Sequence, residues 1–279
     1  MSNLIAKPDN LRAIALMTLA MGMFALEDMA IKKAASDLGI GQIIFILGAS
    51  GAAFFITWSG LTGQRLFDKR LLEPWLLART GGEVIGTFGF VTALSLMSLS
   101  NASAILQATP LVVTMGAALF LGEPVGWRRW SAVIVGFVGV LLIIQPGMAG
   151  FSVYSGFALI GVFGLAIRDV ATRQVKVNIS TQTIASMAYA ALAVPAFFLM
   201  MGTTGWRPVT GDAAWWMLFA VLIGVVAYFV ITTAIRFGEI SAIAPFRYSR
   251  LLFALIVGYI AFGEVPDLLM ITGSALVVG

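Results

Sequence analysis

Residues 13–33 read "AIALMTLAMGMFALEDMAIKK", an apolar run that contains two adjacent carboxylates, Glu27 and Asp28. A helix needs about 20 apolar residues to cross the hydrocarbon core of a bilayer. Further runs of this length follow along the 279-residue chain, of which 60% is hydrophobic and 11% is charged. A soluble domain would carry about a quarter charged residues. The sequence therefore predicts an all-α integral membrane protein that crosses the bilayer many times.

Ten transmembrane helices are predicted from the apolar runs, which are divided by Gly, Pro and charged clusters. The last run is too short to span the bilayer fully, and we expect the native protein to continue beyond Gly279. The predicted helices lie near residues 11–33, 41–61, 74–98, 101–121, 127–146, 153–173, 180–201, 213–237, 241–262 and 266–279.

The 17 Lys and Arg residues are divided unequally between the two sides of the membrane. With the N-terminus in the cytoplasm, ten fall in inner loops, three in outer loops and four within helices. Cytoplasmic loops carry an excess of Lys and Arg, so we predict a cytoplasmic N-terminus. The basic residues are not gathered in one stretch and topology explains them, so we predict no nucleic-acid partner. The inner set is Lys7, Arg12, Arg65, Lys69, Arg70, Arg128, Arg129, Arg173, Lys176 and Arg236, the outer set is Lys32, Lys33 and Arg207, and the helix set is Arg79, Arg168, Arg247 and Arg250.

An internal repeat appears when the sequence is shifted by 141 residues, which aligns "FALEDMAIKK" (24–33) with "LAIRDVATRQ" (165–174). Each unit, 1–150 and 151–279, holds five predicted helices. Because five is odd, the second unit enters the membrane from the opposite side, so we predict two inverted-topology repeats with a binding site near the midplane. Matching pairs are Asp28 with Asp169, Ala30 with Ala171, Trp75 with Trp216, Thr92 with Thr233, Gly122 with Gly263 and Glu123 with Glu264.

The most distinctive motif is "SNASAILQATPLVVTMGAALFLGE" (100–123), followed by a Gly-rich helix that ends in "QPG" at 145–147. Its partial copy, "APFRYSRLLFALIVGYIAFGE", occupies 244–264. These stretches resemble the EamA repeat of the drug/metabolite transporter superfamily, and within it the YddG-like amino-acid exporters. The resemblance implies ten helices around a central cavity, the fifth and tenth towards the periphery. It also implies export of small metabolites across the bacterial inner membrane.

The first helix departs from the family, which often has a "WG" pair and a single Lys there, whereas this chain has "MFALEDMAIKK" (23–33). No substrate-contacting role is therefore carried over to it. Glu27 and Asp28 lie towards the outer end of this helix, and their repeat mates Arg168 and Asp169 lie towards the inner end of the sixth. The four residues either snorkel or cap helix ends, or they form an outer and an inner gate that pair only when their side is closed.

The third helix contains "RTGGEVIGTFGF" (79–90), in which Arg79, Glu83, Thr87 and Phe90 share one face. Arg79 and Glu83 form either an internal salt bridge or functional contacts, Arg79 at the gate and Glu83 with the substrate. Glu83 is the deepest carboxylate predicted, which makes it the best single candidate for an amine contact or a proton site. Thr87 and Phe90 are candidates to line the cavity beside it.

The ninth helix places Arg247, Tyr248 and Arg250 together. A guanidinium binds a carboxylate with two hydrogen bonds. One arginine would therefore hold a substrate carboxylate and the other would pair with Asp169 or Glu83, unless both are structural counter-ions. The repeat mates in the fourth helix include Gln107, and Tyr228 of the eighth helix is a further cavity candidate.

These features favour a secondary transporter that moves a small metabolite by alternating access. The resemblance implies that this metabolite is a neutral or aromatic amino acid. The alternatives are a multidrug, lipophilic-cation or nucleotide-sugar carrier of the same superfamily, a channel, or a membrane enzyme. An enzyme is poorly supported because the chain has neither His nor Cys, and we expect no metal and no cofactor. The sequence contains no P-loop motif, so ATP hydrolysis by this chain is not indicated. Proton coupling and uniport are both compatible with the sequence.

Overall fold

The structure is a computed structural model that describes residues 9–63, 69–122, 124–147, 152–175, 179–237 and 240–278. Of the residues considered above, Lys7, Arg65, Glu123, Lys176 and Gly279 lie outside the described part. The side chains of Lys69, Arg236, Ile240 and Ser241 are likewise not described.

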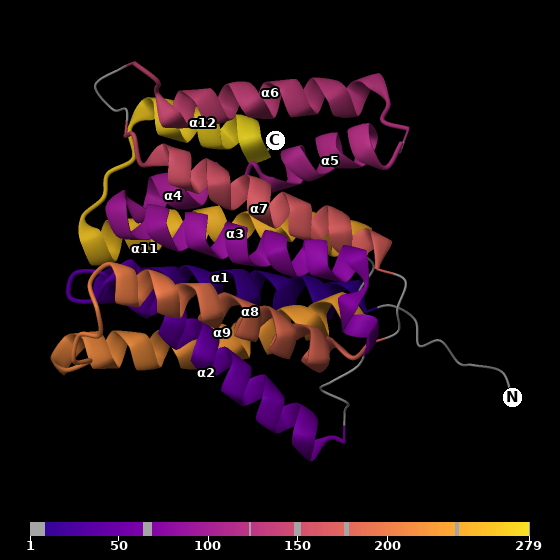
Figure 1. The fold of residues 1–279 in the computed structure, drawn as a ribbon. Helices are drawn as coiled ribbons and strands as arrows, with labels where there is room; N and C mark the ends of the chain where they lie inside the picture. Colours follow the sequence, from indigo (N-terminus) through magenta and orange to yellow (C-terminus); the bar gives the residue numbers. More distant parts are fainter. Residues whose placement is uncertain are drawn as a thin grey trace, which may run out of the picture.

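Regular structure in the described residues is helical throughout (Figure 1). Eight helical segments there are long and apolar enough to cross a membrane, counting Leu99–Phe120 and Ala244–Phe262 as one each. Together with α3 and α12, these segments correspond to the ten predicted helices, which confirms a multi-pass helical membrane protein. The elements are α1 (Asn10–Ala34), α2 (Ile40–Leu61), the 3₁₀ helix η1 (Lys69–Leu72), α3 (Pro74–Leu96), α4 (Leu99–Leu106), α5 (Thr109–Phe120), α6 (Trp127–Ile144), α7 (Ser155–Gln174), α8 (Thr181–Gly202), α9 (Gly211–Phe237), α10 (Ile240–Ile243), the 3₁₀ helix η2 (Ala244–Tyr248), α11 (Ser249–Phe262) and α12 (Leu268–Val278).

Polar residues set where several of these helices begin. Asp9 accepts a hydrogen bond from the backbone N–H of Arg12 at 3.1 Å, and Glu73 accepts one from Leu76 N–H at 2.8 Å. Such side chains occupy backbone donors that have no partner within the helix. The polar residues between the apolar runs thus define helix starts as well as loops.

Two segments expected as single helices, 101–121 and 241–262, are interrupted in the structure. The first divides into α4 and α5, with Pro110 in the first turn of α5, and the second contains η2, which begins just before Pro245. Proline lacks a backbone N–H and interrupts the helical hydrogen-bond pattern. A shift of 141 residues places η2 opposite the end of α4, so the interruptions fall at corresponding positions of the two halves.

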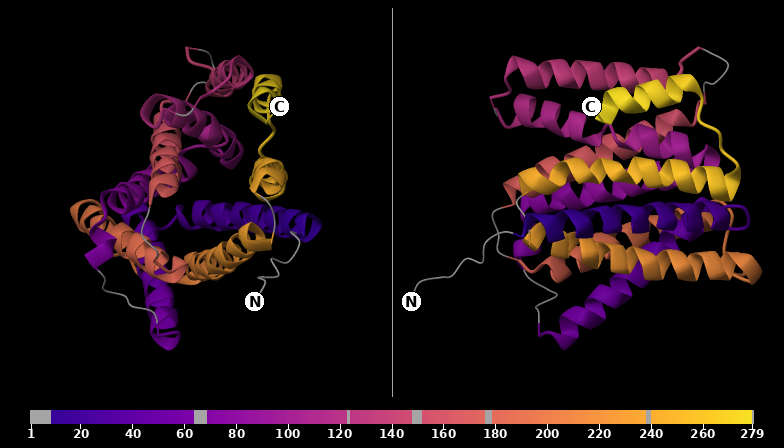
Figure 2. Two further views of the ribbon diagram at one scale, coloured as in Figure 1. Left: turned by 90° about the vertical axis from the view of Figure 1, so that its right-hand side faces the viewer. Right: turned by 180° about the vertical axis from the view of Figure 1, so that it is seen from behind.

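The helices pack mainly in four pairs: α1 with α9, α3 with α7, α2 with α8, and α6 with α12. If each of the first five segments is exchanged with its counterpart five segments later, the α1/α9 pair becomes the α7/α3 pair. The same exchange maps the α2/α8 pair and the α6/α12 pair onto themselves. α6 and α12 lie side by side at one edge of the bundle, and α2 lies at the opposite edge (Figures 1 and 2). The division into repeats at residue 150 and their inverted orientation remain predictions.

Close approach of α3 and α7 depends on glycine. A Cβ at Gly82 would lie 2.6 Å from the backbone nitrogen of Arg168, and one at Gly164 would lie 2.3 Å from the backbone nitrogen of Gly86. Gly81 of the same run faces open space. Because small residues let helix backbones approach closely, the charged side chains of α3 and α7 come within reach of each other.

Candidate functional site

Glu27, Asp28 and Arg250 form a cluster that we call the acid-rich group. Arg250 donates from Nη2 to both Asp28 oxygens at 2.8 and 2.7 Å, and from Nε to Oδ2 at 3.1 Å. The Asp28 side chain is only 3% exposed. The guanidinium carbon lies 5.3 Å from the ring centres of both Phe24 and Phe90. This charge-assisted pair ties α1 to α11 inside the bundle.

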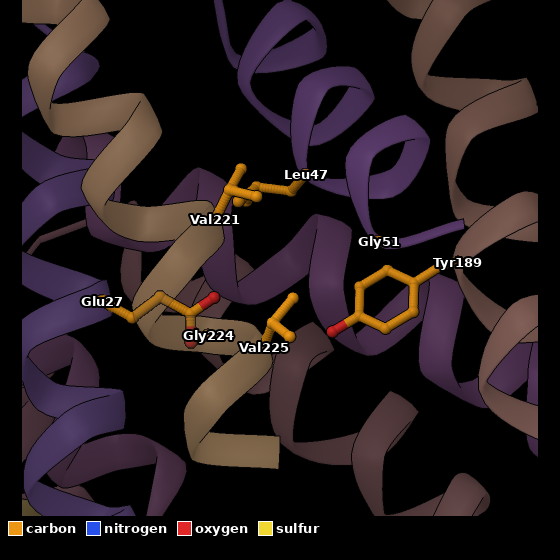
Figure 3. Close-up of a pocket in the computed structure, with 7 residues that line it drawn as sticks. All are labelled: Glu27, Leu47, Gly51, Tyr189, Val221, Gly224 and Val225. Atoms are coloured by element: carbon orange, nitrogen blue, oxygen red, sulfur yellow. The ribbon is translucent and has the colours of Figure 1, made fainter. Parts of the chain in front are cut away.

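Glu27 lies next to this pair but turns towards a different space. It lines a cavity of about 20 Å³ between α1, α2, α8 and α9, and its carboxylate and the Tyr189 hydroxyl both point into that space (Figure 3). Among the described residues, no side chain or backbone group forms a hydrogen bond or an ion pair with Glu27. The remaining lining residues are Leu47, Gly51, Val221, Gly224 and Val225.

A second cluster, the arginine-rich group, consists of Arg79, Glu83, Arg168, Asp169 and Arg247. Arg168 donates from Nη1 to Glu83 at 3.1 Å and from Nε to Asp169 at 2.8 Å. Arg79 approaches the other Glu83 oxygen at 3.5 Å. The contact of Arg168 with Glu83 connects α7 with α3, whereas its contact with Asp169 lies within α7.

Arg247 is the most loosely held member of the arginine-rich group. Its Nη2 lies 4.0 Å from Asp169 Oδ2, and 48% of its side chain is exposed. In comparison, the side chain of Arg168 is 22% exposed and that of Arg250 is 19% exposed. Arg247 sits in η2, at the interruption of the ninth segment. Its guanidinium is therefore the one best placed to take a further anionic partner.

The two groups carry opposite formal charge excesses. In the arginine-rich group three arginines face two carboxylates, and in the acid-rich group two carboxylates face one arginine. Ionisable groups inside a membrane cost several kcal/mol and usually face a partner or a cavity. The bundle therefore holds one arginine and one carboxyl group in excess of their partners of opposite formal charge.

The pairings differ in part from those considered from sequence. Arg168 and Asp169, predicted as an inner gate, join Arg79 and Glu83 in one network, so predicted gate and substrate residues are in contact. Arg250 pairs with Asp28 instead of Asp169 or Glu83, the two partners considered for it. Glu27 and Asp28, grouped as an outer gate, have separate surroundings.

The other predicted cavity residues lie at several places. Phe90 is buried beside Arg250, and Thr87 is partly buried on the same helix. Gln107 is 8% exposed at the junction of α4 and α5, and Tyr248 stands at the junction of η2 and α11. Both junction residues belong to the interrupted segments.

Tyr228 lines a second cavity, of about 90 Å³, between α2, α8 and α9. The Phe55 ring also lines it, stacks on Tyr189 at 5.6 Å and meets Tyr228 edge-on at 5.1 Å. These three rings therefore lie between the two cavities. The other lining residues are Trp58, Thr181, Gln182, Phe229, Thr232 and Thr233.

Sequence reasoning missed a set of contacts at the end of the bundle where α1 finishes, here called the Ala34 end. Glu264 accepts hydrogen bonds from the backbone N–H groups of Leu99 at 2.7 Å and Ser100 at 2.9 Å, which caps α4. Lys32 donates to the Met97 carbonyl and Lys33 to the Ala261 carbonyl. These contacts tie α1, α4 and α11 together. The only signal for them was the repeated "GE" motif that contains Glu264.

Comparison with known proteins identifies relatives of this fold. Residues 11–145 match the EamA-like transporter family. The chain is 28% identical over 206 residues to a riboflavin transporter of Vibrio cholerae, covering 73% of this chain and 68% of that protein. It is 26% identical over 270 residues to a pseudopaline exporter of Pseudomonas aeruginosa, covering 95% and 93%. It is 25% identical over 195 residues to an S-adenosylmethionine uptake transporter of Rickettsia bellii, covering 69% and 66%.

A solved crystal structure also resembles the chain as a whole. It aligns with a TM-score of 0.64 at 18% identity and covers 96% of this chain and 95% of its own. At that identity the likeness concerns the fold alone.

Proposed function

We propose that this chain, whose residues 11–145 match the EamA-like transporter family, is a membrane transporter whose substrate is a small zwitterionic metabolite of the amino-acid type. The observation that carries this proposal is the opposite charge excess of the two groups, unmatched at Glu27 and at Arg247. A zwitterion supplies one positive and one negative group, so it complements both without adding net charge to the membrane interior.

Arg247 is the proposed contact for the substrate carboxylate. Its guanidinium is half exposed and has a single distant partner, Asp169, whereas Arg250 already binds Asp28 through three hydrogen bonds. A planar guanidinium donates two parallel hydrogen bonds to a carboxylate. Substrate binding at Arg247 would also compete with Asp169, which links the site to the contacts between α3 and α7.

The transport mechanism in this proposal is alternating access between two inverted repeats. Interruptions at corresponding places in the fourth and ninth segments support it, because transporters with such repeats build their sites from discontinuous helices. The contacts of Lys32, Lys33 and Glu264 hold the Ala34 end together in this conformation. We propose that this end faces outwards and that the Asn10 end faces the cytoplasm of a bacterial cell.

The named relatives do not select the substrate or the direction of transport. Their names refer to riboflavin, pseudopaline and S-adenosylmethionine, and they include both an exporter and an uptake transporter. The amino-acid class and the export direction therefore rest on the charges of this chain and on its resemblance to the YddG-like branch.

A second candidate function is transport of a lipophilic cation. The unpaired Glu27 and the rings of Phe55, Trp58 and Tyr228 near it favour this reading, because cations bind both carboxylates and aromatic faces. Such a carrier would not need Arg247, and this difference separates the two functions.

Counterflow in proteoliposomes tests the proposal. Proteoliposomes that contain the purified protein are loaded with one unlabelled amino acid at a time. Uptake of the same labelled amino acid is then measured with and without a proton gradient. Riboflavin, S-adenosylmethionine and a lipophilic cation serve as comparators. We expect saturable counterflow with at least one neutral or aromatic amino acid. Counterflow of the cation alone would replace the proposal with the second candidate, and an effect of the gradient would indicate proton coupling.

A further inference from the structure

We propose that the cavity at Glu27 is a binding site for a protonated primary amine. The inference deepens the proposed function and rests on it for the identity of the substrate, but the site itself can be tested separately. In this site the Glu27 carboxylate accepts hydrogen bonds from the ammonium group, and Tyr189 contributes its hydroxyl from the opposite wall. The aliphatic part of the amine contacts Leu47, Val221 and Val225.

The charges of the neighbouring residues leave Glu27 available for such a ligand. Arg250, the single arginine of the acid-rich group, directs all three of its observed hydrogen bonds to Asp28. In contrast, Glu83 and Asp169 each contact at least one arginine. Among the carboxylates described within the membrane helices, only Glu27 faces a cavity without an ion-pair partner. An ammonium ion there would give Glu27 a counter-ion, as Asp28, Glu83 and Asp169 already have.

Two glycines create the space that this site requires. A Cβ at Gly224 would lie 2.4 Å from Glu27 Oε1, and a Cβ at Gly51 would lie 2.3 Å from the nearest ring carbon of Tyr189. Either methyl group would occupy room now taken by the carboxylate or by the ring. The positions of both polar groups in the cavity therefore depend on the absence of a side chain at Gly224 and at Gly51.

The shape of the region indicates how a larger amine would lie. The cavity at Glu27 has a volume of about 20 Å³, and about 10–15 Å³ is enough for one water molecule, so the space suits a group of the size of an ammonium head. The Phe55 ring separates it from the second cavity, of about 90 Å³. An amine with an aromatic tail would place its head at Glu27 and its tail beside Phe55 and Tyr228.

Isothermal titration of the purified full chain in detergent tests the site with two matched probes, phenethylamine and 2-phenylethanol. They share the aromatic tail and differ in the charged head. We expect wild-type protein to bind phenethylamine at least tenfold more tightly than the alcohol. Glu27→Gln should remove that preference and leave the affinity for the alcohol unchanged. Glu73→Gln, the same change at the partly buried start of α3, should alter neither affinity.

A second variant keeps the charge of Glu27 and changes only the space. Gly224→Ala should weaken phenethylamine binding severalfold, because its methyl group displaces the carboxylate. The displaced atoms are the end of a flexible side chain, so the fold should persist. This variant tests the site even if Glu27→Gln does not fold.

Three results would overturn the inference: no preference for the amine in the wild type, unchanged preference in Glu27→Gln, or unchanged preference in Gly224→Ala. Each of these could occur while amino-acid counterflow persists, in which case only the site is wrong. If amine binding depends on Glu27 but no amino acid shows counterflow, the site stands and the proposed zwitterionic substrate is wrong.

Discussion

In the acid-rich group Arg250 binds the single carboxylate of Asp28 through three hydrogen bonds, whereas in the arginine-rich group two carboxylates are shared among three arginines. The first arrangement isolates one ion pair and leaves Glu27 without a partner. In the second, Arg168 contacts both Glu83 and Asp169, so the loss of one partner leaves another in place. The comparison suggests that the isolated pair stabilises the fold and that the shared network can rearrange when a substrate binds.

The largest effect on stability is expected from Arg250→Ala. It leaves the carboxylate of Asp28, whose side chain is 3% exposed, without its counter-ion. Breaking a buried pair by removing one partner costs about 3–5 kcal/mol. Thermal unfolding in detergent should show this loss, and the double variant Asp28→Asn/Arg250→Gln should recover much of it. A single variant as stable as the wild type would contradict the structural role of the pair.

Glu83→Gln should have a smaller effect on stability, because Arg168 retains Asp169 at 2.8 Å and glutamine still provides an acceptor. A lost hydrogen bond to a charged group is worth about 1.5–3 kcal/mol, and we expect the lower end of this range. The same unfolding measurement checks it. A loss equal to that of Arg250→Ala would remove the proposed distinction between an isolated pair and a shared network.

Arg247→Gln should separate transport from stability. Because the side chain is 48% exposed and lies 4.0 Å from Asp169, its removal should change the unfolding temperature little. Counterflow of an amino acid should fall at least tenfold, which corresponds to about 1.4 kcal/mol. Arg128→Gln, at the exposed start of α6, is the matched control and should behave as the wild type. Undiminished counterflow in Arg247→Gln would favour the cation carrier.

The smallest expected effect comes from Glu264→Gln, which weakens the cap on α4 at the Ala34 end. A helix cap contributes about 1 kcal/mol, and such a change shifts an equilibrium about fivefold. The chain has no cysteine, so Ser103→Cys, a position that is 1% exposed in α4, gives a single thiol to label. Labelling with a membrane-impermeant maleimide should become about fivefold faster when Glu264→Gln is added. Equal rates would show that Glu264 does not hold this end closed.

Much of the fold could be predicted because apolar runs and the residues between them act locally. Runs of membrane-spanning length indicate transmembrane helices wherever they occur. The two interruptions were not predicted, although Pro110 and Pro245 were visible, because a proline can also sit in the first turn of a helix without breaking it. The outcome depends on the neighbouring helices, which a single segment does not reveal.

The candidate site was predictable only as a set of residue types. The sequence singled out the charged residues in the helices, and the structure places all of them in two groups. It could not identify the partner of Arg250, since Asp28 is 222 positions away in the chain. It also gave no reason to single out Tyr189, Gly51 or Gly224, whose roles arise from side chains on other helices.

The sequence by itself determined that this is a helical membrane protein, similar to EamA-like transporters over residues 11–145, with ionisable residues inside its helices. Length and apolarity decide whether a segment enters a membrane, and these are properties of the segment alone. Only the tertiary structure decided why the neighbours in "FALEDMAIKK" differ, Asp28 paired with Arg250 and Glu27 facing a cavity. Successive residues on a helix point in different directions, so adjacent carboxylates face different neighbouring helices. The side chains of those helices decide whether each carboxylate finds a partner.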